Sequence, residues 1–310
     1  MAAESRRASV VRNLDDQRGS ASRKQVRAYW DAHPVGSERV PYQVGSPKWV
    51  ETLYEKWKEG IDDHRLKFLE SCRGKRVLEV GSGIGVDARY LIENGIDYQG
   101  LDYSFQSLQL SRKMVEAGNL SGRWVNGDAT ALPFGDEEFD LVYSIGVLHH
   151  VPDMEKASRE LMRVVKRGGT VRVMLYNRHS YHYAVMIYVV LPLIWLMTRL
   201  PIPSAIATHL PEKFREMYLI AKHQGFDQRR LLNSSTDTSH PGEGHFNPLS
   251  RFVTEREVRA LFDQLEDFRF FRMTLSYFPI PLLRRFVEKH FGFHLTFSAT
   301  KRSDARDQRN

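Results

Sequence analysis

Short apolar runs alternate with helical periodicity along the middle of the chain. Val77, Leu78 and Val80 form a run without polar alternation, which is typical of a strand covered on both faces. Comparable runs, separated by helical patterns, predict strands over 98–102, 124–128, 139–144 and 170–176. Strands and helices that alternate in this way predict an α/β fold with a mostly parallel sheet and right-handed crossovers.

The segments on either side of this core have different patterns. Helices are expected from Ser22 to just before Pro34 and from Pro47 to about Cys72, because apolar residues recur there at helical spacing. Two final strands are expected over 268–274 and 293–300. A basic helix separates them, through Arg284, Arg285 and Lys289.

The first strand ends in a turn with glycine at three alternate positions, Gly81, Gly83 and Gly85. A backbone without Cβ atoms can bend sharply and let a ligand lie against it, which is typical of a nucleotide site. A pyrophosphate site would carry G-x-G-x-x-G/A, but Val86 stands at the third glycine position. The phosphate alternative therefore fits poorly.

Two carboxylates favour a different nucleoside ligand. Glu79 lies at the end of the first strand and Asp102 at the end of the second. A carboxylate suits an ammonium group beside a sulfonium, and a second carboxylate can accept hydrogen bonds from two ribose hydroxyls. This pattern predicts S-adenosylmethionine as the ligand.

Five blocks resemble the class I S-adenosylmethionine-dependent methyltransferases, and the small-molecule branch with quinone-biosynthesis enzymes is the most similar. The blocks cover 77–85, 127–129, 132–134, 139–142 and 161–169. The resemblance implies an α/β, Rossmann-like sheet of seven strands, mostly parallel, with helices on both faces. It also implies an N-terminal helical lid, and the chain adds apolar cap insertions after strand 5 and between the last two strands.

The resemblance also assigns boundaries and cofactor contacts. We expect a disordered basic tail over 1–21, a helical lid over 22–73, an S-adenosylmethionine-binding core over 74–177, a cap insertion and loop over 178–253, completion of the sheet over 254–301 and a polar tail over 302–310. By resemblance, Asp128 accepts from the adenine amino group while the Ala129 amide donates to the ring. The expected cofactor residues are Glu79, Gly81, Ser82, Gly83, Gly85, Asp102, Tyr103, Asp128, Ala129, Ser144 and Ile145.

Two adjacent histidines follow the fourth strand at the edge where ligands bind in open α/β sheets. His149 or His150 is a candidate general base, because imidazole titrates near neutral pH. The alternative is that one ring only fixes the loop, since methyl transfer often needs no more than positioning and desolvation. Tyr29, on the lid helix, is the third catalytic candidate.

Composition narrows the setting. The formal net charge is +7, and much of it lies in the two terminal segments, which favours solvated tails over a nucleic-acid surface. A single cysteine, Cys72, excludes an internal disulfide framework and fits a reducing cytoplasm, and the polar N-terminus has no apolar signal region. We therefore expect a cytoplasmic protein with membrane association left open.

Residues 183–200 are almost continuously apolar, with Pro192 inside and Arg199 near the end. A bilayer-spanning helix needs about 20 such residues, so this segment is too short. Two interpretations stay open: a buried cap helix that walls an apolar acceptor pocket, which we favour, or a helix in a membrane interface, where Trp, Tyr and arginine are common.

A long polar loop over 232–251 is expected to gate the site or contact the acceptor. His240, Glu243 and His245 lie in it, but their spacing matches no recognised metal-ligand signature, so no metal is expected.

These features predict a methyltransferase that acts on a small or moderately apolar molecule, with the acceptor atom and the oligomeric state left open. One alternative is a peripheral-membrane enzyme that acts on a quinone or lipid. Another is an RNA methyltransferase, although the Asn/Asp-Pro-Pro-aromatic block of base-amino methyltransferases is replaced by 144–147 here. We do not expect a nucleic-acid partner.

Overall fold

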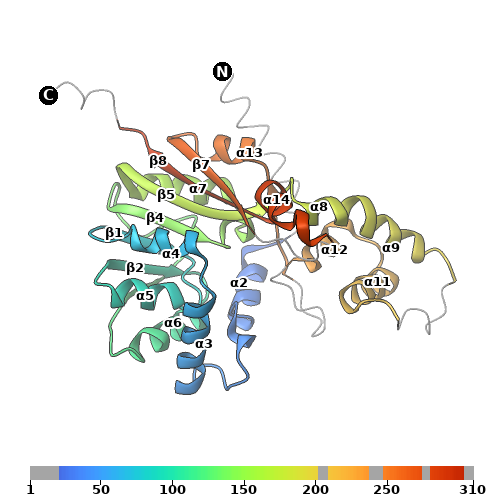
Figure 1. Ribbon diagram of the computed structural model, residues 1–310, viewed down its shortest axis with the longest axis horizontal. Coiled ribbons are helices and arrows are strands. Elements are labelled where there is room, and N and C mark those ends of the chain that lie inside the picture. Colours follow the sequence, from blue (N-terminus) through green and yellow to red (C-terminus); the bar gives the residue numbers. More distant parts are fainter. Residues whose placement is uncertain (1–20, 202–208, 237–246, 274–279, 304–310) are drawn as a thin grey trace.

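The computed structural model describes residues 21–201, 209–236, 247–273 and 280–303. One sheet runs through the molecule in the order β3-β2-β1-β4-β5-β8-β7 (Figure 1). Its strands are β1 Arg76–Val80, β2 Asp97–Asp102, β3 Arg123–Asn126, β4 Phe139–Ile145, β5 Val165–Asn177, β7 Leu265–Met273 and β8 His294–Lys301. The first five are parallel, whereas β8 is antiparallel to both β5 and β7. The predicted fold class is confirmed.

The sheet has eight strands where the sequence predicts seven. The additional strand, β6 Phe252–Val253, pairs parallel to the end of β5. Two residues are too few to produce a recognisable alternation, so the pattern of apolar positions gives no signal for this strand.

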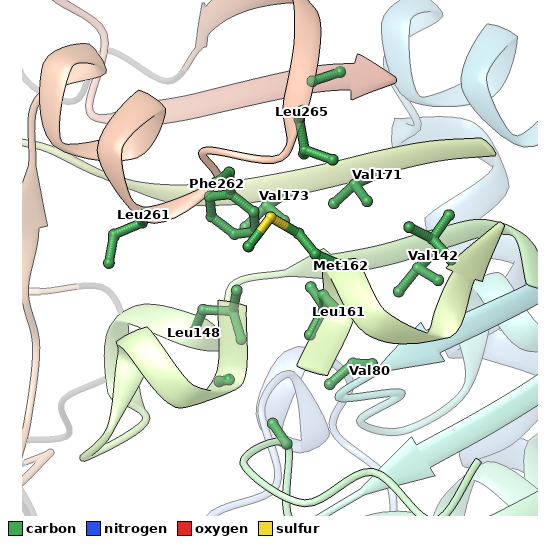
Figure 2. Close-up of a cluster of buried hydrophobic side chains, with 14 of the residues drawn as sticks. Val80, Val142, Leu148, Leu161, Met162, Val171, Val173, Leu261, Phe262 and Leu265 are labelled. Atoms are coloured by element: carbon green, nitrogen blue, oxygen red, sulfur yellow. The ribbon is translucent and has the colours of Figure 1, made fainter. Parts of the chain in front are cut away.

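Helices cover both faces of the sheet. Successive residues of β1 point to opposite faces: Val77 belongs to a buried cluster with Phe68 and Leu91, from α4 Asp63–Glu70 and α5 Val86–Glu93. Leu78 belongs to the larger cluster on the other face, where sheet residues meet α7 Met154–Val164 and α13 Glu255–Leu261. Figure 2 shows this cluster through Val80, Val142, Leu148, Leu161, Met162, Val171, Val173, Leu261, Phe262 and Leu265.

The N-terminal helices pack beside the glycine turn. α2 Arg23–Ala32 begins after Ser22, as the sequence predicts, and a capping box of Ser22 and Gln25 opens it. The single helix expected from Pro47 to Cys72 is instead two, α3 Pro47–Gly60 and α4. The break has a local cause, because the Asp62 carboxylate accepts a hydrogen bond from the Arg65 amide at 2.9 Å and so caps the second helix.

The apolar insertion forms a continuous helical segment: α8 Tyr181–Val185, a π-helical turn over Met186–Val190, and α9 Leu191–Met197. One side packs against α11 Glu212–Gln224 and α12 Gln228–Ser234, and this unit projects from the end of the sheet (Figure 1). The other side exposes Tyr188 (77 %), Val189, Leu193, Trp195 and Leu196 to solvent. Among the described residues, no helix is long and apolar enough to span a bilayer.

The helix between the last two strands, α14 Pro281–Phe291, also exposes apolar side chains. Leu282 is 95 % and Phe286 60 % exposed, and Arg284, Arg285 and Lys289 lie on the same helix. Its end is near the start of α8, because the rings of His182 and Phe293 are 4.8 Å apart. The two helices are therefore neighbours at one end of the molecule.

Gly85 is needed where α5 approaches α6 Phe105–Glu116. Its φ is +79°, and a Cβ there would lie 2.7 Å from the Cα of Ser111. Gly95, at the other end of α5, has a similar φ of +71° but nothing within 4 Å of such a Cβ. The two glycines share a backbone conformation and differ in the space around them.

We expect Gly95→Ala to lower the free energy of unfolding by about 1 kcal/mol, the cost of a left-handed residue. Gly85→Ala should cost a further 1–3 kcal/mol or so, because its methyl group also overpacks against Ser111. Chemical denaturation of both variants checks this. Equal losses would show that α5 and α6 can separate freely.

Candidate functional site

A cavity of about 470 Å³ opens at the carboxyl ends of the parallel strands. The lid helix α2, α4, the turns after β1, β2, β3 and β4, and one face of β5, β7 and β8 all contribute to its wall. Nine of the eleven expected cofactor residues line it, and so does one of the three catalytic candidates. These residues are Glu79, Gly81, Ser82, Gly83, Asp102, Tyr103, Asp128, Ala129, Ile145 and His150.

Backbone hydrogen bonds tie the glycine turn to the end of β2. The amides of Gly81 and Ser82 both donate to the Leu101 carbonyl oxygen, at 2.7 and 3.1 Å. The Gly83 amide donates to the Asp102 carboxylate at 2.8 Å. The two acidic strand ends therefore lie at one edge of the sheet, as the sequence predicts.

Glycine is also required for the approach of two turns. A Cβ on Gly81 would lie 2.2 Å from a methyl carbon of Val147, in the turn after β4. At Gly83 a Cβ would meet nothing within 4 Å, so a side chain there would extend into open space. The first glycine permits close packing, and the second leaves room for a ligand against the backbone.

Glu79 is 5 % exposed and lies among charged and aromatic groups. It accepts a hydrogen bond from the Tyr98 hydroxyl at 2.5 Å. Burial raises the pKa of Glu79 well above its usual range, and the nearby charge of Asp87 raises it further. Asp87 is itself held by the Arg65 guanidinium through two hydrogen bonds, at 2.7 and 3.1 Å. A ligand cation near Glu79 would therefore favour its ionised form.

Asp102 accepts from the amides of Gly83 and Ser104, both at 2.8 Å. Burial raises its pKa to about 6, and the two amide donors act in the opposite direction. Asp128 accepts from the Thr130 amide at 2.8 Å and lies 3.7 Å from the Arg23 guanidinium of the lid helix. Each carboxylate is thus oriented by a backbone donor while it lines the cavity.

His150 is positioned by a segment about 100 residues further along the chain. Its Nδ1 lies 2.6 Å from the carbonyl oxygen of Leu249. A carbonyl can only accept, so Nδ1 carries the hydrogen and, in the neutral ring, the basic lone pair belongs to Nε2. The ring lies 5.0 Å from that of Trp30, between centroids, and lines the cavity. His150 is therefore suited to take up a proton.

His149 does not line the cavity. It is fully buried, and its ring packs 3.9 Å from that of Tyr176 and 4.0 Å from that of His150. Burial lowers the pKa of His149 well below its usual range, and neighbouring His150 and His294 lower it further. The structure therefore separates the two histidines, with His149 behind the cavity wall as a neutral ring.

Three further expected site residues lie away from the cavity wall. The Ser144 hydroxyl is buried and donates to the Val80 carbonyl oxygen at 2.8 Å, because this residue of β4 faces the neighbouring strand β1. Gly85 instead permits the close approach of α5 and α6. Tyr29 is 8 % exposed and packs against Trp30 and His33, while Val26 and Trp30 of the same helix line the cavity.

The segment 181–197 contributes no described residue to this cavity. The expectation that it walls the acceptor pocket is therefore wrong for this cavity, since its buried side is used up by α11 and α12. The apolar wall comes instead from other elements: Trp30, Val147, Met174, Tyr176 and Met273.

Sequence reasoning missed the residues on β5, β7 and β8. Arg172, Met174 and Tyr176 lie at alternate positions of β5, so they share one face, and His294 and Thr296 do the same on β8. The alternation in β5 was available as a signal. Which face lies toward the site depends on the sheet order, which the sequence does not contain.

The end of the predicted polar loop does reach the site. Arg251 is 1 % exposed. Its guanidinium donates a hydrogen bond to the Pro152 carbonyl oxygen at 2.7 Å, and its backbone amide donates to the His149 carbonyl oxygen at 3.0 Å. These contacts hold the turn that carries His150. The rejected metal candidates His240, Glu243 and His245 lie outside the described residues.

Comparison with known proteins agrees with this geometry. Residues 78–173 match the family model described as "Methyltransferase domain". The chain is 30 % identical over 148 residues to Methyltransferase GfsG from Streptomyces halstedii, which covers 47 % of this chain and 48 % of that protein. It is 35 % identical over 108 residues to 2-methyl-6-phytyl-1,4-hydroquinone methyltransferase from Synechocystis sp., which covers 34 % of each. The chain thus spans less than half the length of these curated relatives.

A solved structure shares the fold. Haemonchus contortus phosphoethanolamine N-methyltransferase 2, in complex with S-adenosyl-L-methionine, is 16 % identical, with a TM-score of 0.50 over 92 % of this chain and 61 % of that chain. The acidic strand ends, the open space at Gly83 and the family match agree with one another. Residues 78–173 therefore form a class I S-adenosylmethionine-dependent methyltransferase domain, and S-adenosylmethionine is its cofactor.

Proposed function

We propose that this chain transfers a methyl group from S-adenosylmethionine to a small or moderately apolar acceptor. The observation that carries the proposal is one cavity with two chemically different halves. The carboxylates Glu79, Asp102 and Asp128 lie at or after β1, β2 and β3, on one side of the strand order, whereas the apolar side chains of β5 and His150 after β4 lie on the other side. The first half suits a cationic nucleoside and the second suits an apolar acceptor.

In this proposal each residue of the site has a separate role in cofactor binding, acceptor binding or proton transfer. Glu79 accepts from the ammonium group, Asp102 from the ribose hydroxyls and Asp128 from the adenine amino group. S-adenosylmethionine supplies an electrophilic methyl group. Trp30, Met174 and Tyr176 exclude water from the acceptor, and His150 Nε2 takes the proton that the acceptor loses. The Leu249 carbonyl oxygen, which accepts from Nδ1, keeps the ring oriented.

A second candidate places the same chemistry at a membrane surface, with a quinone or lipid as acceptor. It is favoured by the exposed apolar side chains of α8–α9 and α14, which carry arginines and a lysine nearby. Tryptophan, tyrosine and basic residues are common in helices that lie in the membrane interface. The hydroquinone that names the Synechocystis relative carries a long apolar chain, which is compatible with this candidate.

The cofactor assignment predicts that Asp102→Ala weakens binding of S-adenosylmethionine by about 1.5–3 kcal/mol, the contribution of a hydrogen bond to a charged group. Isothermal titration calorimetry at pH 7.5 measures it, with thermal unfolding as a check that the turn stays folded. NAD serves as the competing nucleotide. Binding of NAD alone by the wild type would refute the proposed function.

The pH dependence of S-adenosylmethionine binding is the control for the Asp102→Ala experiment. The ribose hydroxyls need the ionised carboxylate, and the pKa of Asp102 in the free protein is about 6. The affinity should therefore fall by up to about tenfold per pH unit as the pH drops below 6. In Asp102→Asn, which has no proton to exchange at this position, the decline with a midpoint near pH 6 should be lost, and any decline that remains belongs to Glu79, whose pKa burial also raises.

The two histidines are expected to differ in their effect on turnover. Once an acceptor is found by screening for release of S-adenosylhomocysteine, His150→Gln should lower kcat by about 10²–10⁴-fold, because glutamine cannot take up the proton. His149→Gln should lower the unfolding temperature but keep kcat within about tenfold. Equal losses of kcat in both variants would remove His150 as the base.

The membrane candidate predicts that the protein sediments with vesicles of phosphatidylcholine and phosphatidylglycerol. Trp195→Glu and Phe286→Glu should each lower the bound fraction severalfold, because a buried charge opposes insertion into the interface. Val44→Glu, at an exposed apolar residue near the N-terminal helices, is the matched control. If all four proteins partition equally, the exposed helices do not contact the membrane.

A further inference from the structure

A buried arginine lies in the wall of the cavity, on strand β5. Arg172 is 9 % exposed, pairs in register with Tyr143 of β4 and Ser298 of β8, and lines the cavity. It shares its face of β5 with Met174 and Tyr176, the residues of the apolar half. The Arg172 side chain therefore forms part of the cavity wall and is largely shielded from bulk water.

Within the described part of the chain, no carboxylate pairs with this guanidinium. Its Nε is buried and has no hydrogen-bond partner among those residues. The neighbouring Arg65 differs, because Asp87 holds it through two hydrogen bonds. Burial lowers the pKa of Arg172, while the charges of Asp62 and Asp87 act in the opposite direction without forming a salt bridge to it. The site thus contains one arginine that is neutralised and one that is not.

Aromatic contacts account for only part of the environment of Arg172. Its guanidinium carbon lies 4.3 Å from the ring centroid of Phe68 and 5.8 Å from that of Phe271. Such contacts stabilise a cation over the ring faces, but they leave its in-plane N–H donors unused. The planar fork of arginine is suited to bind a carboxylate through two parallel hydrogen bonds.

The geometry points to Arg172 as the binding site for a carboxylate of the ligand in this cavity. This inference rests on the proposed function, since the carboxylate belongs either to the acceptor or to the methionine end of the cofactor. Glu79 and Arg172 lie on strands separated by β4, so their backbones are about 10 Å apart. That separation favours the acceptor, because the ammonium and carboxylate groups of methionine share one carbon.

The test uses Arg172→Met, which removes the charge and keeps an apolar contact with Phe68, and Arg172→Lys, which keeps the charge and loses the fork. Arg39→Met removes an exposed arginine from the same cavity and is the control. In the first arm, calorimetry compares S-adenosylmethionine with its decarboxylated analogue. In the second, ligand-observed NMR compares benzoate with benzamide on the protein loaded with S-adenosylhomocysteine.

The wild type should prefer the carboxylate ligand at least tenfold in one of the two arms. Arg172→Met should abolish that preference, Arg172→Lys should reduce it, and Arg39→Met should keep it. Loss in the first arm assigns the cofactor carboxylate, and loss in the second assigns the acceptor.

Two other outcomes are distinguishable. A folded Arg172→Met protein that leaves both comparisons unchanged would overturn the inference, while normal binding of S-adenosylmethionine would leave the proposed function intact. If the wild type does not bind S-adenosylmethionine at all, the proposed function itself is refuted.

Discussion

The hydrogen bonds that fold the turn after β1 onto the end of β2 are the constraint on which the site depends. The Leu101 carbonyl oxygen accepts from two successive amides of the turn, and the Asp102 carboxylate accepts from a third. A backbone can direct three donors at one neighbouring strand only if it turns through left-handed conformations, which Gly81 and Gly83 adopt. The turn therefore brings Glu79 and Asp102 to one cavity and leaves its own outer surface for a ligand.

The sequence predicts this half of the site well because its information is local. Strand, glycine turn and helix follow within about a dozen residues, and each acidic residue stands directly at or after a strand. Parallel strands bring their carboxyl ends to one edge, and consecutive strands are usually neighbours in the sheet, so Glu79, Asp102 and Asp128 are expected near one another. The pattern of apolar positions also predicts the flanking helices and the last two strands.

The acceptor half could not be predicted, because it depends on contacts between distant segments. His150 is oriented by Leu249, and the turn beneath it is held by Arg251. β8 lies between β5 and β7, so His294 and Thr296 reach the cavity only through a strand order that no local pattern encodes. The role of the apolar segment 183–200 was predicted wrongly for a related reason. Apolar composition indicates burial or a surface contact, but it does not show which element the segment contacts.

The charges of the cavity suggest how ligand binding and protonation are linked. Burial raises the pKa values of both Glu79 and Asp102, so each carboxyl keeps its proton to a higher pH than a solvent-exposed carboxyl, and Asp87 adds to this effect at Glu79. A cation that binds there stabilises the ionised forms and releases protons, which makes it a better partner than a neutral ligand of the same shape. Arg172, two strands away on β5, is a cation that would be stabilised by an anion. The charges are balanced only when a cation lies beside Glu79 of β1 and an anion lies beside Arg172 of β5. The charge pattern alone would then favour simultaneous occupation by cofactor and acceptor.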